Sequence, residues 1–160
     1  MTKLPQAPWE SPAWVQRTQT LLDSFARWLG RELLPRDGTA LAQSQRLFEA
    51  PFVVVAHGTQ PDPILDFANQ SALDMWAADL PTLLSLPSRK TAEPMHRDER
   101  ARMLQRTREQ GYIDDYQGVR ISTDGRRFRI RQAIVWNLVD AAGSHAGQAA
   151  TFDQSEWIEC

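Results

Sequence analysis

The sequence has only one cysteine, and it stands at the last position, Cys160. A single thiol excludes a disulfide within the chain and any metal site built from several cysteines. The first residues, MTKLPQAPWESP, contain no apolar stretch of the kind found in signal peptides. No later apolar run is long enough to span a bilayer. We therefore expect a cytoplasmic protein that is neither exported nor anchored in a membrane.

Motifs that carry chemistry are also missing. The 8 glycines are scattered and form no phosphate-binding loop between a strand and a helix. There is no histidine pair at helical spacing and no alternating aspartate loop with a terminal glutamate, so we expect no metal site. Ser88 lies in LPSRK without a nucleophile elbow. Asp114 and Asp115 are adjacent, so a strand would turn them to opposite faces. We expect no catalysis.

Charge is small in total but uneven along the chain. The formal net charge is −2, which gives no indication of a nucleic-acid partner. Residues 89–131, however, hold 12 of the 18 Lys and Arg against 7 acids, a net charge of +5. This segment is interpreted as a solvated helix and an outer sheet face, and the alternative is a basic surface for an anionic partner.

One domain suits a chain of 160 residues. Residues 1–13 are interpreted as a flexible arm, because they contain several prolines and no periodicity. An amphipathic helix is predicted over 14–35, ending at Pro35. Its apolar stripe either covers the domain or pairs with a second copy to form a homodimer. The stripe consists of Trp14, Leu21, Leu22, Phe25, Trp28, Leu29 and Leu33.

The segment 40–153 alternates between helical and strand patterns, and 154–160 is interpreted as a C-terminal tail. Strands are predicted at 52–56, 64–68, 112–122, 126–139 and 145–153. Helices are predicted at 41–49, from the cap residue Asn69 to Trp76, and in a longer segment that ends at Gln110 before Gly111. The order is helix, two strands, short helices, one helix and three strands.

A hairpin is predicted around Asp124 and Gly125, because this pair suits a two-residue type I′ turn. The ladder then joins residues whose numbers sum to 249: Ile121 with Phe128, Val119 with Ile130, and Gln117 with Gln132. This apolar face would be the inner one. The other face would meet water or a protein partner, and it carries Tyr116, Arg120, Arg127, Arg129 and Arg131. A three-residue loop with a bulge at Gly125 would change this register.

Glutamines on an inner face need an explanation, because a buried amide without partners costs about 1 to 3 kcal/mol. Gln148 shares a face with Phe152 on the last strand and joins Gln117 and Gln132. Amides both donate and accept hydrogen bonds, so they suit a small polar ligand. The alternative is a structural ladder of glutamines without a ligand. The other candidate lining residues are Phe52, Val54, Ile130, Ile134 and Trp136.

Several segments resemble the MEKHLA domain family: FANQSALDMW (67–76), LPSRKTAEPMHRDER (86–100), GYIDDYQGVRISTDGRRFRI (111–130), AIVWNLVD (133–140) and GQAATF (147–152). The resemblance implies an α+β, PAS-like fold. Such a fold has a five-stranded antiparallel sheet in the order 2-1-5-4-3 with helices on one face. PAS-like domains sense a ligand, a cofactor or a partner. The connection that contains Arg89 rims the cleft in such folds, so Arg89 is a further candidate for binding an acidic group.

Cofactor chemistry can be compared with this fold. A flavin photosensor of the light-oxygen-voltage type needs a reactive cysteine on the helix after the second strand, and this chain has none there. A flavin–thiol adduct is therefore excluded. Haem needs one axial histidine, but we assign structural roles to His57, His96 and His145. The sequence thus predicts a non-catalytic sensory module, and the alternative is an interaction module that works through its outer sheet face and N-terminal helix.

Overall fold

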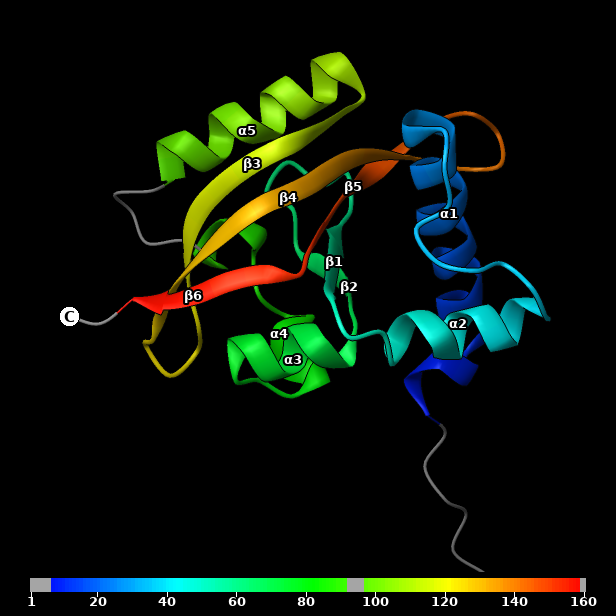
Figure 1. Ribbon diagram of the computed structural model, residues 1–160, viewed down its shortest axis with the longest axis horizontal. Coiled ribbons are helices and arrows are strands. Elements are labelled where there is room, and N and C mark those ends of the chain that lie inside the picture. Colours follow the sequence, from blue (N-terminus) through cyan, green and yellow to red (C-terminus); the bar gives the residue numbers. More distant parts are fainter. Residues whose placement is uncertain (1–6, 92–96, 159–160) are drawn as a thin grey trace, which may run out of the picture.

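One antiparallel sheet organises the computed structural model, which describes residues 7–91 and 97–158. Five strands follow the order β2-β1-β5-β4-β3 (Figure 1). They are β1 (Val53–His57), β2 (Leu65–Ala68), β3 (Tyr112–Ile121), β4 (Arg127–Val139) and β5 (His145–Phe152). This is the order that the family resemblance implied, so that prediction is confirmed.

A sixth strand, β6 (Gln154–Ile158), occupies residues that the sequence had suggested were a tail. It pairs with β4 from Arg127 to Arg131, whereas β5 pairs with β4 from Ile134 to Val139. Both strands therefore use the same edge of β4, which is 13 residues long. The ring of Trp157 contacts Phe128 at a centroid distance of 5.5 Å, so β6 also adds apolar contact.

The helices lie close to their predicted positions. They are α1 (Pro12–Leu29), α2 (Ala40–Phe48), α3 (Gln70–Trp76), α4 (Leu80–Leu83) and α5 (Arg97–Gln110), with 3-10 turns η1 (Pro8–Glu10) and η2 (Ser88–Thr91). Helix α1 begins earlier than predicted, because the Ser11 hydroxyl accepts from the Trp14 amide and caps it. It also ends at Leu29 instead of continuing to Pro35. No helix within 7–91 and 97–158 has the length and apolarity to cross a bilayer.

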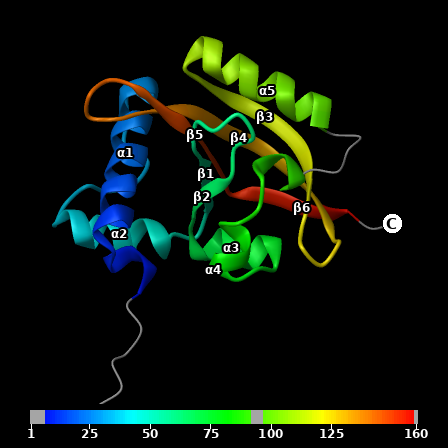
Figure 2. The ribbon, with the colours of Figure 1, turned by 180° about the vertical axis from the view of Figure 1, so that it is seen from behind.

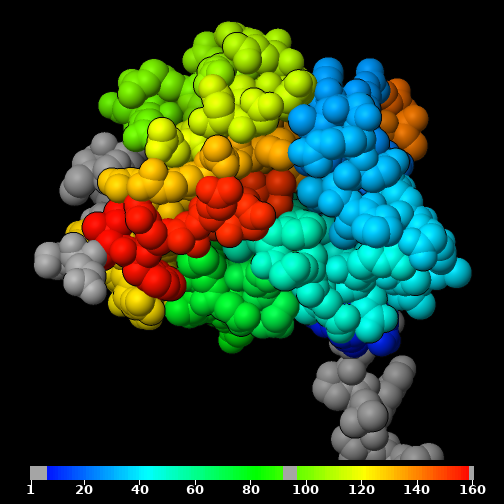
Figure 3. Space-filling view, viewed as in Figure 1, coloured from blue at the N-terminus to red at the C-terminus, as the bar shows by residue number. Residues whose placement is uncertain are grey.

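Two apolar clusters lie on opposite faces of the sheet. Helices α3, α4 and α5 cover one face, called the inner face below, while α1 covers part of the other (Figures 1 and 2). On α1, Leu21, Leu22 and Phe25 are fully buried, and the Trp28 indole donates to the Asn137 carbonyl at 2.9 Å. In the space-filling view α1 and α2 form one continuous mass beside the sheet (Figure 3). The apolar stripe of α1 therefore packs within the chain.

Arg17 fastens α1 to three strands. Its guanidinium donates to the Asp66 carboxylate of β2 at 2.8 Å, to the Ala146 carbonyl of β5 at 3.0 Å and to the His57 carbonyl of β1 at 3.2 Å. Charge-assisted hydrogen bonds of this kind are stronger than neutral ones. The position of α1 is thus tied directly to the backbone of the central strands.

The predicted register of the β3–β4 hairpin is wrong by one residue. Ser122 bonds with Arg126 across a three-residue loop, and Gly125 takes φ +85°. Val119 lies opposite Arg129, so residue numbers sum to 248 instead of 249. A slip of one residue exchanges the two faces of a strand. The loop that was recognised as the alternative therefore turns Gln117 outward.

A second change of face occurs within β4. Gln132 takes φ +50°, which is rare for a residue with a side chain and marks a bulge where the pairing of β4 passes from β6 to β5. Before the bulge Phe128 and Ile130 belong to the inner-face cluster. After it Val135 does so, and Trp136 belongs to the cluster under α1. The predicted alternation through Gln132 to Trp136 is therefore wrong.

Candidate functional site

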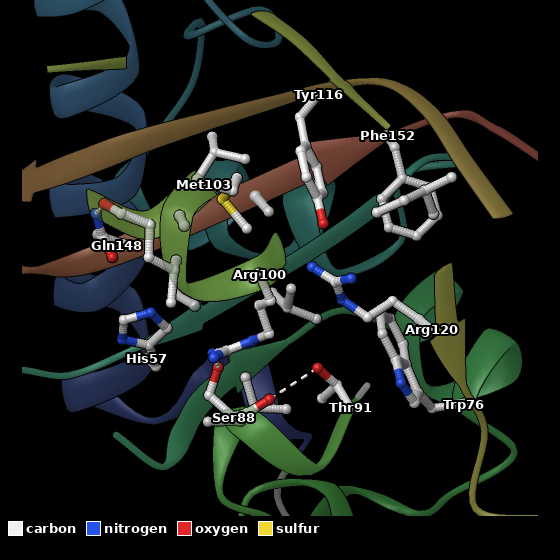
Figure 4. Close-up of a pocket in the computed structure, with 18 residues that line it drawn as sticks. His57, Trp76, Ser88, Thr91, Arg100, Met103, Tyr116, Arg120, Gln148 and Phe152 are labelled. Atoms are coloured by element: carbon white, nitrogen blue, oxygen red, sulfur yellow. Dashed lines mark hydrogen bonds between the residues drawn. The ribbon is translucent and has the colours of Figure 1, made fainter. Parts of the chain in front are cut away.

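A cavity of about 60 Å³ lies between the inner face of the sheet and the segment formed by η2 and α5 (Figure 4). We call it the inner cavity. Strands β1, β3, β4 and β5 all contribute to its walls. Its polar lining residues are His57, Ser88, Thr91, Arg100, Tyr116, Arg120 and Gln148. Its apolar lining includes Val55, Leu65, Trp76, Met103, Leu104, Ile130, Val135, Ala150 and Phe152.

The structure separates the three glutamines that were predicted to line a single pocket. Gln148 does reach the inner cavity, where its amide nitrogen donates to the Leu104 carbonyl at 3.0 Å and to Asn137 Oδ1 at 3.1 Å. Gln117 and Gln132 are exposed on the opposite face. Gln132 accepts there from the Gln154 amide at 2.9 Å. The prediction of one cavity lined by three amides is therefore wrong. The one-residue shift of the β3–β4 register turns Gln117 outward, and the bulge in β4 lies at Gln132.

The predicted apolar walls divide in the same way. Ile130 lines the inner cavity. Phe52, Val54, Ile134 and Trp136 pack in the cluster beneath α1 instead. The Trp136 indole donates to the Leu21 carbonyl at 3.2 Å and meets the Phe25 ring edge-on at 5.1 Å. Trp136 thus anchors α1 to the sheet.

Arg89 does not enter the inner cavity, although its neighbours Ser88 and Thr91 do. Its side chain is exposed and forms an ion pair with Asp62 at 3.1 Å. This contact is of the surface kind that contributes little to stability. The assignment of Arg89 as a contact for an acidic group is therefore not supported by its position.

The predicted outer face keeps three of its five members. Arg129 and Arg131 pair with Glu156 of β6, and the hydrogen bond from Arg131 lowers the pKa of that carboxyl group. Arg127 is half-buried on the same strand. Tyr116 and Arg120 instead point inward, because the register differs by one residue. Like Gln117 and Gln132, these two residues therefore lie on the face opposite to the predicted one.

Two arginines and one tyrosine give the inner cavity its polar character (Figure 4). Arg120 and Tyr116 come from β3 and Arg100 from α5, and their exposed fractions are 6%, 7% and 8%. The Arg120 guanidinium carbon lies 5.4 Å from the centre of the Tyr116 ring. The Tyr116 hydroxyl is buried without a hydrogen-bond partner. This hydroxyl approaches the backbone at Gly118 closely, which is possible because glycine has no side chain. A Cβ at position 118 would lie 2.2 Å from the hydroxyl oxygen.

Arg100 escaped the sequence analysis, although a signal was present. Arg100, Met103 and Thr107 stand at helical spacing and are all buried, so an arginine begins the inner stripe of α5. Arg100 donates to the Ser88 hydroxyl. Burial, followed by repulsion from Arg120, lowers the pKa of Arg100 from its ordinary value to about 10. The group therefore remains positively charged at neutral pH.

His57 contributes a second buried polar atom without a partner. Its Nδ1 lies 2.9 Å from the Gly58 carbonyl, and since a carbonyl only accepts, Nδ1 carries the proton. Nε2 is then an acceptor, and it is buried without a hydrogen bond. Burial lowers the pKa of His57 below 6.5, and the nearby charge of Arg100 lowers it further. His57 is therefore neutral at physiological pH.

The lowered pKa of His57 predicts a loss of stability in mild acid. As pH falls below about 6.5, the unfolded chain takes up a proton before the folded one does, so the free energy of unfolding decreases. One histidine contributes at most about 1.4 kcal/mol per pH unit. Urea unfolding between pH 7.5 and 5.5 measures this slope. We expect His57→Gln to flatten it more than His145→Gln, because His145 is exposed. Equal slopes for the parent and His57→Gln would contradict the assignment.

A flavin, one of the two cofactors considered above, does not match the volume of the inner cavity. An engineered cavity that holds benzene measures about 150 Å³, and a three-ring flavin is larger still, so it does not fit into about 60 Å³. Cys160 and His96 lie outside the described residues. In the part of the chain that the structure describes, no three His, Cys, Asp or Glu side chains are grouped to hold a metal ion.

Comparison with known sequences gives a consistent result. The MEKHLA domain model matches residues 15–157. The chain is similar to the homeobox-leucine zipper protein REVOLUTA of Arabidopsis thaliana, with 28% identity over 134 residues, or 82% of this chain and 16% of that protein. It is also similar to HOX29 of Oryza sativa subsp. indica, with 27% identity over 84% of this chain and 15% of that protein. The chain thus spans about a sixth of these relatives.

Comparison with solved structures identifies the fold alone, because the identities are low. A PAS domain from Colwellia psychrerythraea superposes with a TM-score of 0.61 at 11% identity, covering 73% of this chain and 94% of that one. A light-oxygen-voltage domain studied with a flavin analogue gives 0.57 at 18% identity, covering 74% and 85%. An RNA-binding light-oxygen-voltage receptor gives 0.58 at 13% identity, covering 94% and 36%.

Proposed function

Because this chain belongs to the MEKHLA domain family and has a PAS-like fold, we propose that it is a non-catalytic sensory module that binds a small molecule in the inner cavity. The observation that carries this proposal is the Tyr116 hydroxyl, which is buried at the cavity without a partner. A buried polar group without a hydrogen bond costs about 1 to 3 kcal/mol. A ligand that bonds this group removes that cost.

The position of the inner cavity supports the same reading. It lies between the central strands and α5, so an occupant would contact both layers of the fold. Its volume of about 60 Å³ exceeds the roughly 15 Å³ that one water molecule needs. It is nevertheless smaller than a benzene-binding cavity, so the occupant is a small molecule or the end group of a larger one. Mixed apolar and polar walls are typical of ligand sites.

A cavity-filling variant tests this proposal. Ala150 lies on the inner face of β5 and lines the inner cavity, so Ala150→Leu places additional methyl groups in the space. We expect mass spectrometry of compounds released from denatured protein to find a small molecule with the parent and at least tenfold less with Ala150→Leu. Ala141→Leu, in the exposed β4–β5 turn, is the matched control and should retain the compound.

Two results would contradict the proposal. One is that no compound is released from the parent protein when it is purified from its own cells. The other is that Ala150→Leu, folded as judged by circular dichroism, carries as much compound as the parent. Either result would favour the alternative, an interaction module whose partner is a protein. Phe25 of α1 is no longer part of the interaction surface in that alternative, because its side chain is completely buried.

A further inference from the structure

We infer that the ligand of the inner cavity is a small carboxylate with a short apolar body, whose carboxylate is held by Arg100, Arg120 and the Tyr116 hydroxyl. This inference rests on the proposed function and specifies the chemical class of the ligand. Arg120 and Tyr116 of β3 face Arg100 of α5 because the observed register of the hairpin differs by one residue from the predicted one (Figure 4).

The first argument is charge. Arg100 and Arg120 are each more than nine-tenths buried, and an isolated buried cation is costly unless an opposite charge accompanies it. Within 7–91 and 97–158, no carboxylate forms an ion pair with either guanidinium. Asp62 attracts Arg100 through space, but it is engaged by Arg89. Two like charges therefore share one cavity, and a bound anion would neutralise part of their repulsion.

The second argument is the balance of donors and acceptors. A guanidinium has five N–H donors and no acceptor. Arg120 donates to the Val119 carbonyl at 3.0 Å, and Arg100 donates to the Ser88 hydroxyl. Within 7–91 and 97–158 the two guanidinium groups form no other hydrogen bond, and the Tyr116 hydroxyl is buried without a partner. The site is therefore rich in donors, which match the acceptor oxygens of a carboxylate, and arginine is well suited to bind such a group with two parallel bonds.

The third argument is the character of the other walls. Val55, Met103, Ile130, Val135 and Phe152 give the inner cavity apolar surfaces around the two arginines. Such walls favour a ligand with an alkyl body over a fully hydrated anion such as phosphate. The volume of about 60 Å³ limits that body to a few carbon atoms. Butyrate carries a carboxylate on a three-carbon chain and is the probe of this chemistry, and butyramide is its neutral counterpart with a similar shape.

Binding of the two probes distinguishes charge from shape. Protein freed of bound compounds by unfolding, dialysis and refolding is mixed with butyrate, butyramide or inorganic phosphate at constant pH and ionic strength. Thermal unfolding and calorimetry then measure binding. We expect saturable binding of butyrate, with an increase of roughly 5 °C in Tm at a concentration about 100 times Kd. We expect at least tenfold weaker binding of butyramide.

Three variants locate the carboxylate. Arg120→Met and Arg100→Met keep much of the side-chain length but remove the charge, and each should weaken butyrate binding roughly tenfold to hundredfold. Tyr116→Phe removes only the hydroxyl and should weaken binding roughly threefold to tenfold. Arg131→Met is the matched control on the opposite face, where Arg131 pairs with Glu156. It should leave the affinity for butyrate unchanged.

Unfolding of the ligand-free variants separates binding from a structural role. Removing an unpaired buried charge should leave Tm equal to or above that of the parent. A similar fall in Tm for Arg120→Met and for Glu93→Gln, whose position lies outside the described residues, would overturn the inference. It would mean that a carboxylate of the chain itself neutralises the arginine. Tyr116→Phe provides a second measure if an arginine variant does not fold.

The remaining outcomes also decide the question. Equal affinities for butyrate and butyramide would overturn the carboxylate assignment and leave the small-molecule proposal standing. Tighter binding of phosphate than of butyrate would overturn the apolar body of the ligand. If no probe binds, the carboxylate inference fails. If no compound is released from the native protein either, the proposed function fails with it.

Discussion

Replacement of Asn69 by alanine is expected to lower the free energy of unfolding by about 3 to 5 kcal/mol. Asn69 is fully buried, and its side chain satisfies four backbone groups. Its Oδ1 accepts from the Val54 amide at 3.0 Å and the Ala72 amide at 3.2 Å. Its Nδ2 donates to the Phe52 carbonyl at 2.8 Å and the Leu47 carbonyl at 3.1 Å. Alanine would remove all four hydrogen bonds, and of these groups the Leu47 carbonyl would still accept from the Ala50 amide at 3.3 Å.

Urea unfolding of the variant measures this loss. Gln70→Ala is the control, because Gln70 is the exposed neighbour and its side-chain amide donates to Asp74 on the surface of α3. It should change the free energy of unfolding by less than about 0.5 kcal/mol. A loss of under about 1 kcal/mol for Asn69→Ala would contradict the view that one amide holds the end of α2, the start of β1 and the start of α3 together.

The second large effect is expected for Gly147→Ala, with a loss of about 3 to 4 kcal/mol and a fall in Tm of roughly 10 °C. Gly147 takes φ +123°, which side chains rarely adopt. A Cβ at this position would also lie 2.0 Å from the His57 carbonyl oxygen. Because that oxygen belongs to the backbone of β1, two central strands would have to move apart.

Gly143→Ala separates the two parts of this cost. Gly143 takes φ +83° in the preceding turn, and a Cβ there would meet nothing within 4 Å. The control therefore keeps the backbone strain and removes the steric clash, and we expect it to cost about 1 to 2 kcal/mol. Thermal unfolding of both variants gives the comparison. Equal losses would show that the contact with His57 does not limit the spacing of the strands.

The sequence was sufficient for the fold because its strong local signals agree with the final packing. Asn69 was identified as a helix cap, and it does accept from the Ala72 amide. The stripe of α1 predicted a face that covers an apolar surface, and Phe25 is buried there. Patterns within one element are fixed by a few neighbouring residues, so a single sequence reveals them. The resemblance to the family supplied the strand order.

The site could not be predicted to the same extent, because it depends on which face each strand turns inward. Asp124 and Gly125 fit both a two-residue turn and the loop that forms, and these differ by one residue in register. The bulge at Gln132 then reverses the alternation a second time within β4. The apolar pattern of β3 does not decide between the two registers, because Val119 and Ile121 lie on one face and Tyr116 lies on the other.

The inner position of Arg120 illustrates this limit. A row of arginines at 127, 129 and 131 favoured assigning Arg120 to the same outer surface. Charged side chains usually lie in water. Arg120 is buried because η2 and α5 cover the inner cavity that it lines. The sequence alone gave no measure of that packing. The charged cavity therefore became visible only when the strands were placed in register.

His57 takes part in two environments at once. Its ring lines the inner cavity, while its carbonyl oxygen accepts from Arg17 of α1, on the opposite side of the sheet. A single residue of β1 therefore contacts both the inner cavity and helix α1. An occupant that displaces β1 would change the hydrogen bond between His57 and Arg17. The displacement would thereby reach α1, which lies on the outside of the molecule.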